Sequence, residues 1–104
     1  MRAKTTSARR SLHLAASRNS VETAKLLIAY HADLNAREDY KRTPLHTTAS
    51  SNSIETAKLL IAHHADVNAR GYLDHTPLID AGREGNREME ALLRQHGAID
   101  RWRS

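Results

Sequence analysis

Apolar residues recur along the chain at helical spacing, in short stretches that polar loops separate. In the central stretch they fall at positions i, i+3, i+6 and i+7, on one face of a helix that Leu59 widens. These positions are Ile54, Ala57, Leu60 and Ile61. Ser53 stands where it can cap this helix, and we expect the helix to end near His63–His64.

A shorter helix is predicted immediately before it. Thr43 at the cap with Pro44 at the first helical position is a strong start signal, and we expect this helix to reach about Ser51. Asn52 tolerates the left-handed backbone conformation that a tight turn to the next helix needs. The predicted unit is therefore helix, tight turn, helix and long polar loop.

This unit repeats every 33 residues. Residues 19–37 return at 52–70 with 16 of 19 positions identical, and a diverged third copy begins at Thr76. Self-similarity at this period predicts stacked units that bury a continuous core together, because one short helix pair cannot bury its apolar face alone. We expect units over residues 10–42, 43–75 and 76–104.

The repeats resemble the ankyrin repeat. In the second unit the resemblance rests on TPLH at 43–46, the Leu59–Leu60 pair, and Ala65, Asp66, Asn68 and Ala69. The first unit matches at Leu12, His13, Ala15, Ala16, Leu26, Leu27, Ala32, Asp33, Asn35 and Ala36. The third matches at Thr76, Pro77, Leu78, Ala81, Gly85, Leu92, Leu93, Gly97 and Ala98. The resemblance implies an all-α repeat solenoid of three stacked helix-turn-helix units joined by long β-hairpin-like loops.

The first two units depart from the family pattern at glycine. They carry other residues between the two helices, after the second helix and at the loop tip, namely Asn19 and Asn52, His31 and His64, and Lys41 and Asp74. If the fold holds, some of these residues adopt positive φ, where each carries a cost against glycine. We predict positive φ at Asn52 and His64.

The two ends of the array differ in polarity. In the third unit Arg87, Glu90 and Arg94 replace apolar residues, which predicts a wet C-terminal cap where the array ends. The first unit shows no such conversion. Its apolar face is therefore covered by the tail, meets a partner, or belongs to a chain cut from a longer protein. We expect a monomer unless this face self-associates.

The net charge of +4 comes from the N-terminal tail. Arg2, Lys4, Arg9 and Arg10 account for the whole excess, so residues 11–104 are balanced, whereas a nucleic-acid-binding protein normally carries a basic stripe on its folded body. We expect residues 1–9 to be disordered, with docking on an acidic partner as the alternative. We expect Trp102, just beyond the cap, to fold back over the third unit.

Little in the sequence points to catalysis or metal binding. No serine–histidine–acid set, phosphate loop or paired carboxylates stand out, and we predict no catalytic residue, no metal site and no cofactor. His13 and His46 occupy the TPLH position, where the resemblance implies a structural hydrogen bond from one unit to the next loop. Four further histidines, His31, His63, His64 and His96, fall at helix ends by repeat register, where local sensitivity near pH 6.5 is more plausible than metal binding.

The resemblance implies a binding surface on the loop tips and the inner face of each first helix. Tyr40 and Tyr72 are two of only four aromatic residues, and both fall at tips; bracing of adjacent loops is the alternative role. By register the predicted partner-binding residues are Leu14, Arg18, Asp39, Tyr40, Arg42, Thr47, Ser50, Ser51, Tyr72, Leu73, His75, Asp80, Arg83 and Glu84.

These features favour a non-enzymatic protein-interaction module, acting as an adaptor, inhibitor or sequestering protein on a protein partner. A regulatory or effector fragment of a larger protein is one alternative, and association of the basic tail with nucleic acid or an acidic surface is another. No small-molecule substrate is expected. The chain has no cysteine, which fits a cytoplasmic location, with the nucleus or a host cell as alternatives for an effector. Its longest apolar runs are far shorter than a membrane span.

Overall fold

The computed structural model describes residues 11–99, apart from the side chain of Asp39. The expectations for the tail, residues 1–9, and for Trp102 therefore lie outside the described residues. The helices are residues 11–18, α2 (Val21–Ala29), α3 (Pro44–Ser51), α4 (Ile54–Ala62), α5 (Pro77–Glu84) and α6 (Arg87–Gln95). The expected all-α repeat solenoid is confirmed.

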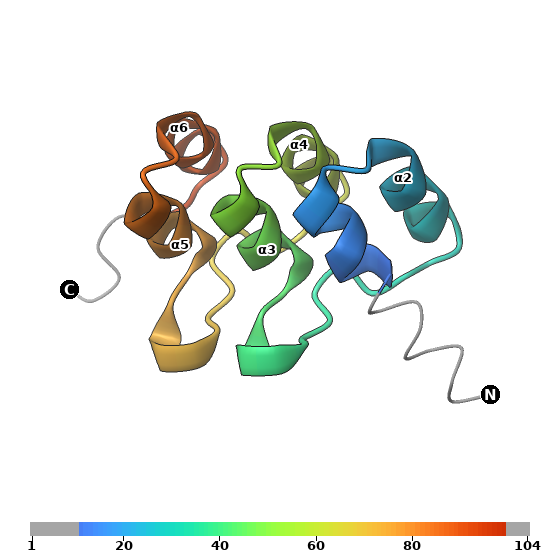
Figure 1. The fold of residues 1–104 in the computed structure, drawn as a ribbon, viewed down its shortest axis with the longest axis horizontal. Coiled ribbons are helices and arrows are strands. Elements are labelled where there is room, and N and C mark those ends of the chain that lie inside the picture. The colour runs from blue at the N-terminus through green and yellow to red at the C-terminus, as the bar shows by residue number, and fades with distance from the viewer. Residues whose placement is uncertain (1–10, 100–104) are drawn as a thin grey trace.

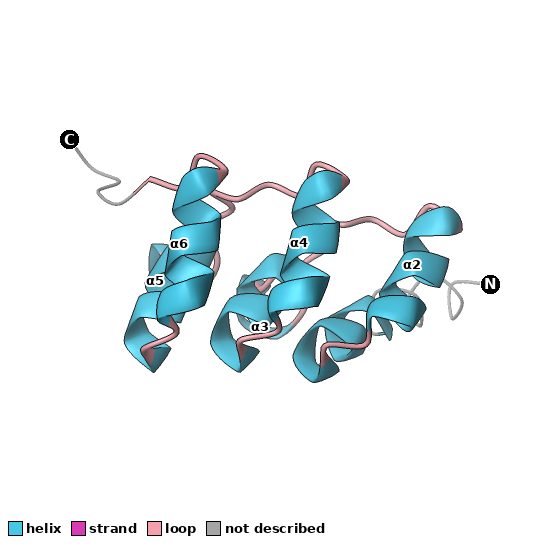
Figure 2. Cartoon of the chain, turned by 90° about the horizontal axis from the view of Figure 1, so that it is seen from above, coloured by secondary structure: helices cyan, strands magenta, loops and turns pink. Residues whose placement is uncertain are grey.

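The helices form two layers. The inner layer holds the first helix of each unit (residues 11–18, α3 and α5), and the outer layer holds α2, α4 and α6, side by side in both views (Figures 1 and 2). Two loops project from the inner layer, and each carries one 3₁₀ turn at its tip, η1 (Asp39–Lys41) or η2 (Tyr72–Asp74). The angle between these loops and the inner helices creates the concave side of the protein.

The predicted helix starts and turns are confirmed. The Thr43 side chain accepts a hydrogen bond from the His46 backbone N–H, and Pro44 occupies the first turn of α3. Asn52 and His64 adopt positive φ, at 57° and 71°. The equivalent residues Asn19 and His31 do so as well. Asparagine and histidine replace glycine at these corners because they tolerate the left-handed region better than other side chains.

The outer helix α4 is capped from the neighbouring unit. Ser53 is its N-cap residue, as predicted, but the Ser53 side chain makes no capping bond. The Asn19 side-chain oxygen instead accepts hydrogen bonds from the backbone N–H and hydroxyl of Thr56, at 3.0 and 2.9 Å. Because a helix begins with unsatisfied N–H groups, this contact couples folding of the second unit to the presence of the first.

Two inner helices are capped in the reverse direction, at their C-terminal carbonyls. Asn86 donates from its side-chain amide to the carbonyl of Ala49, at 2.7 Å, at the end of α3. The Ser51 hydroxyl shares its one proton between the carbonyl of Ala16, at 3.3 Å, and the nearer carbonyl of Thr47 in its own helix, at 2.9 Å. Each unit therefore supplies hydrogen bonds that the helices of its neighbour cannot make alone.

The core is built from one leucine per inner helix and from small side chains between the layers. Leu12, Leu45 and Leu78 are equivalent by the 33-residue period and are all buried. Small side chains on the helices allow the helices to approach closely. The buried alanines within the helices are Ala15, Ala16, Ala24, Ala49, Ala57 and Ala81. In the outer layer, Leu60, Met89 and Leu93 complete this core.

The two ends of the array are finished differently. On α6, Arg87 and Arg94 are exposed where the second unit has partly buried isoleucines, in agreement with the predicted polar face. On α2, Leu26 and Tyr30 are exposed at 60% and 78%. Leu59, the equivalent of Leu26, is partly buried because the first unit lies against it.

Within residues 11–99, no helix has the length and apolar character needed to cross a membrane.

The loops are hairpin-like in one respect. The backbone N–H of Glu38 donates to the carbonyl of Arg42, and Gly71 donates to His75 in the same way, at 2.9 and 2.8 Å. No strand is assigned in the part of the chain that the structure describes. Both central residues of each tip have positive φ: Tyr40 and Lys41, and Leu73 and Asp74. A tight turn with two left-handed residues is of type I′, which favours asparagine and glycine.

The two corner asparagines provide a matched test of inter-unit capping. We expect Asn52→Gly to leave stability unchanged or raise it by up to about 1 kcal/mol, because glycine adopts positive φ without strain. Asn19→Gly should lower stability by about 1–3 kcal/mol, because it leaves the buried Thr56 donors without an acceptor. Urea denaturation followed by circular dichroism measures both. Equal effects of the two substitutions would contradict the capping role of Asn19.

Candidate functional site

Each projecting loop is attached to the inner helix of its own unit by a histidine. The His13 imidazole lies 2.9 Å through Nε2 from the carbonyl of Arg42. His46 repeats this contact one unit later, with Nε2 2.8 Å from the carbonyl of His75. The structural role expected for these histidines is therefore observed. The two bonds tie both loops to the inner layer.

The hydrogen bonds of His46 define its protonation state. A carbonyl can only accept, so Nε2 carries the proton, while Nδ1 accepts from the backbone N–H of Thr43 at 3.1 Å. The imidazole is 1% exposed. Burial lowers the pKa of His46 below its ordinary value of 6.5 and outweighs the opposing effects of the His75 carbonyl and Asp80, while the cations of Arg37 and Arg42 lower it by smaller amounts. His46 is thus a neutral structural group.

Gly71 allows this histidine to approach the loop. A Cβ atom at Gly71 would lie 3.2 Å from Nε2 of His46 and 3.2 Å from the Lys41 carbonyl. The sequence prediction did not identify this position. A glycine one residue before a loop tip gives no local signal that an imidazole 25 residues earlier in the chain packs against it.

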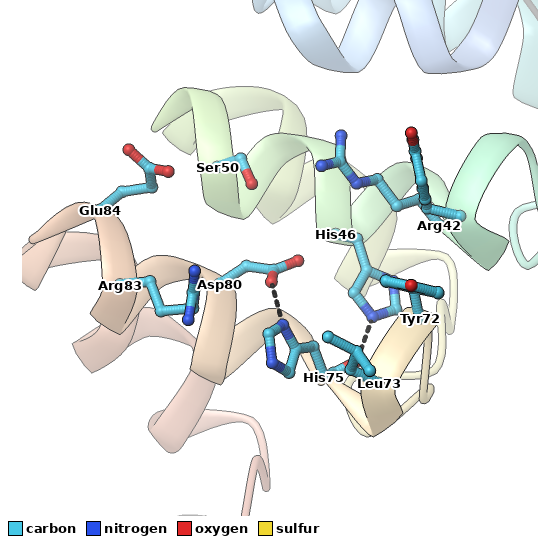
Figure 3. A pocket seen from close by; sticks show the side chains of 10 residues that line it. Arg42, His46, Ser50, Tyr72, Leu73, His75, Asp80, Arg83 and Glu84 are labelled. Atoms are coloured by element: carbon cyan, nitrogen blue, oxygen red, sulfur yellow. Dashed lines mark hydrogen bonds and ion pairs between the residues drawn. The ribbon is translucent and has the colours of Figure 1, made fainter.

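A groove of about 360 Å³ lies between the loops and the inner helices (Figure 3). We call it the concave groove. It is lined by Tyr40, Arg42, His46, Ser50, Tyr72, Leu73, His75, Asp80, Arg83 and Glu84. All of these except His46 are among the predicted binding residues. His46 was assigned a purely structural role, and it has that role while its ring also forms part of the groove wall.

The other predicted binding residues lie outside the concave groove. Leu14 and Arg18 line a separate hollow of about 180 Å³ beside α2. Thr47 and Ser51 lie on α3, and the Ser51 hydroxyl is engaged with the Ala16 and Thr47 carbonyls. Asp39 lies at the first loop tip. The structure therefore divides the predicted surface into one main groove and a smaller flanking area.

The two tip tyrosines touch each other. The ring centroids of Tyr40 and Tyr72 are 5.4 Å apart in an edge-to-face arrangement. This contact joins the two loops, as the bracing role requires. The side chains are nevertheless 64% and 55% exposed, and neighbouring Leu73 is 69% exposed. Bracing therefore uses only part of the apolar surface at the tips.

The opposite side of the groove carries a carboxylate. Asp80 on α5 lies with Oδ1 3.6 Å from Nδ1 of His75, and its side chain is only 13% exposed. Burial raises the pKa of Asp80 above its ordinary value, against the opposing effects of His46, His75, Arg42 and Arg83. The equivalent residues in the first and second units are Leu14 and Thr47, so this charge belongs to the third unit alone.

The groove contains no constellation for metal binding. Within residues 11–99, no three histidine or acidic side chains come together in a way that could hold a metal ion. His46 and His75 are neighbours through a backbone carbonyl, and Asp80 is the one carboxylate paired with either ring in the described range. The arrangement is suited to noncovalent contacts, with aromatic, cationic and anionic groups around one groove.

Comparison with known families agrees with this architecture. A family model for ankyrin repeats, in three copies, matches residues 11–101. The chain belongs to the ankyrin repeat family. No curated protein matches the chain. Ankyrin repeats are generally protein–protein interaction modules and are typically non-enzymatic. In this ankyrin array the histidine-held loops and the inner helices together form the concave groove.

The burial of His46 makes the stability of this ankyrin array depend on pH. Because the folded-state pKa lies below 6.5, the unfolded chain binds the proton first as the pH falls. The His46 contribution is complete above about pH 6.5 and should decline below it, by up to about 1.4 kcal/mol per pH unit. Urea unfolding at about pH 7.5 and about pH 5.5 measures this decline.

Two variants isolate the effect. His46→Gln should be less stable at neutral pH and should lose less stability on acidification than the unmodified chain. Asp80 acts in the opposite sense, because its raised folded-state pKa lets the folded chain bind a proton first and gain stability as the pH falls through that value. Asp80→Asn should therefore show the steeper loss where carboxyl groups titrate, which a third measurement at about pH 4 records. A decline in His46→Gln equal to that of the unmodified chain would contradict the assignment.

Proposed function

We propose that this ankyrin array is a non-enzymatic binding module that holds a protein partner in the concave groove, as an adaptor, an inhibitor or a sequestering protein. Residue types typical of binding hot spots gather at the tips, namely Tyr40, Tyr72 and Arg42. The proposal places this binding in a reducing compartment such as the cytoplasm, since the chain has no cysteine.

The observation that carries this proposal is the combination of strain and exposure at the loop tips. Tyr40 and Leu73 have φ of 62° and 58°, a conformation that disfavours bulky side chains. Such strain persists only where something compensates for it, and Leu73 is 69% exposed and gains little from packing. Contact with a partner would supply the burial that the free protein lacks.

A second apolar surface on the first unit offers a different location for a partner. Leu26 on α2 and Tyr30, the residue that follows α2, are exposed, but neither has the positive φ that strains the loop tips. A stacked unit would leave such residues exposed wherever no neighbour covers them. Strained exposed residues are the stronger sign of a binding role, and this favours the concave groove.

A triple substitution tests the location directly. The full chain and the Tyr40→Ala/Arg42→Ala/Tyr72→Ala variant serve as baits in native lysate, and the affinity of each captured protein is then measured with purified components. Removal of the three side chains should weaken binding by about 2 kcal/mol or more, roughly 30-fold. Tyr30→Ala is the matched control, because it removes a tyrosine outside the groove that is even more exposed than Tyr40 and Tyr72. A partner lost with Tyr30→Ala and retained by the triple variant would overturn the proposal.

Leu73→Gly should have opposite effects on stability and binding. Glycine relieves the strain at positive φ, so the free energy of unfolding should rise by about 0.5–1 kcal/mol. Affinity for the partner should fall, because an exposed apolar contact at the groove is lost. Thermal unfolding and isothermal titration calorimetry measure the two effects. If the Leu73→Gly variant is less stable than the unmodified chain, or binds the partner equally well, Leu73 serves packing within the protein and not partner binding.

A further inference from the structure

The Asp80 carboxylate is a charged group of the concave groove that is mostly buried and incompletely paired. Its side chain is 13% exposed, and among the described residues none donates a hydrogen bond to it. Its nearest partner, Nδ1 of His75, stands 3.6 Å away and is positive only when the ring is protonated. In Figure 3 the carboxylate points from α5 toward the space beside His46 and Arg42. A carboxylate that is largely removed from water and incompletely paired favours a cation.

The neighbouring arginines do not form the salt bridge that would pair the Asp80 charge. Arg42 and Arg83 line the same groove, and each lowers the pKa of Asp80 through its charge, yet burial outweighs both and the pKa remains raised. No salt bridge joins either arginine to Asp80 in the described part of the chain. Both arginines are exposed. An exposed, hydrated cation gains about 0–1 kcal/mol from pairing, so the arginines impose a weaker preference than the desolvated carboxylate does.

The surroundings of Asp80 suit the rest of a long basic side chain. Glu84 follows one helical turn after Asp80 on α5 and is exposed, which extends the negative side of the groove toward solvent. Tyr72 and Leu73 line the opposite side and offer apolar surface for the methylene stem of a lysine or an arginine. Aromatic rings also attract cations through their faces.

We propose that the partner inserts a lysine or arginine side chain into the concave groove and pairs it with the Asp80 carboxylate. This inference rests on the proposed function and specifies the chemistry of the partner. The methylene stem of that side chain packs against Tyr72 and Leu73. Its charged end forms an ion pair with Asp80, which compensates for the desolvation of the carboxylate. The third unit therefore determines the preference for a basic residue. The equivalent positions of the first and second units carry the uncharged residues Leu14 and Thr47.

A selection with short random peptides displayed on phage tests the inference without a known partner. The full chain is the target, and clones whose binding is lost on Tyr72→Ala are retained as groove binders. These clones should be enriched in lysine or arginine. Synthetic peptides are then compared with versions in which that residue is methionine, which keeps the length and removes the charge. On the unmodified chain this change should weaken binding about tenfold or more, and on Asp80→Asn by about twofold or less.

The controls separate charge from folding and separate the two proposals. Asp80→Asn keeps the shape of the side chain and is expected to fold, which circular dichroism verifies. Glu88→Gln removes an exposed carboxylate on α6 outside the groove and should leave peptide affinity unchanged. Groove binders with an acidic or uncharged anchor, or with a basic anchor indifferent to Asp80→Asn, would overturn this inference and leave the proposed function in place. A selection that yields no groove-dependent clone would overturn both.

Discussion

The hydrogen bond from an inner-helix imidazole to the carbonyl of the following loop is the contact on which the concave groove depends. His46 reaches the His75 carbonyl at 2.8 Å, and His13 reaches the Arg42 carbonyl at 2.9 Å. In His46 the Nδ1 atom accepts from the Thr43 backbone N–H, so this ring is neutral with its proton on Nε2, and burial favours the same neutral form. Because these bonds fix both loops, the tip residues can be exposed and strained and still be held in place.

Stacking explains why the polar contacts of this protein run between units. Asn19, Ser51 and Asn86 all complete the ends of helices that belong to a neighbour. Helices of eight or nine residues would be marginal alone, and their unsatisfied end groups would add to the cost. The inter-unit bonds therefore convert weak elements into one cooperative array. The strain at Tyr40 and Leu73 is then a small opposing contribution that the array can carry.

Much of this arrangement could be predicted from the sequence because the repeat imposes it. The 33-residue period gave the units, Thr43-Pro44 gave the start of α3, and Asn52 and His64 were correctly expected at positive φ. Contacts between units were harder to predict, because they join residues that are far apart in the sequence. Asn19 and Thr56 are 37 residues apart, and Ser53 looked like a sufficient cap in the local sequence. Positive φ at Tyr40 and Leu73 was not foreseen, because residue type argues against it, and the burial of Asp80 depends on two loops and two helices at once.

Hydrogen–deuterium exchange of the full chain, free and bound to its captured partner, is the most direct test of binding in the concave groove. We expect protection of the amides of the two loop tips, η1 and η2, and of the exposed end of α5, with α6 and the outer surface of α2 unchanged. Protection confined to α2, where Leu26 and Tyr30 are exposed, would contradict the account and locate the partner on the end of the array.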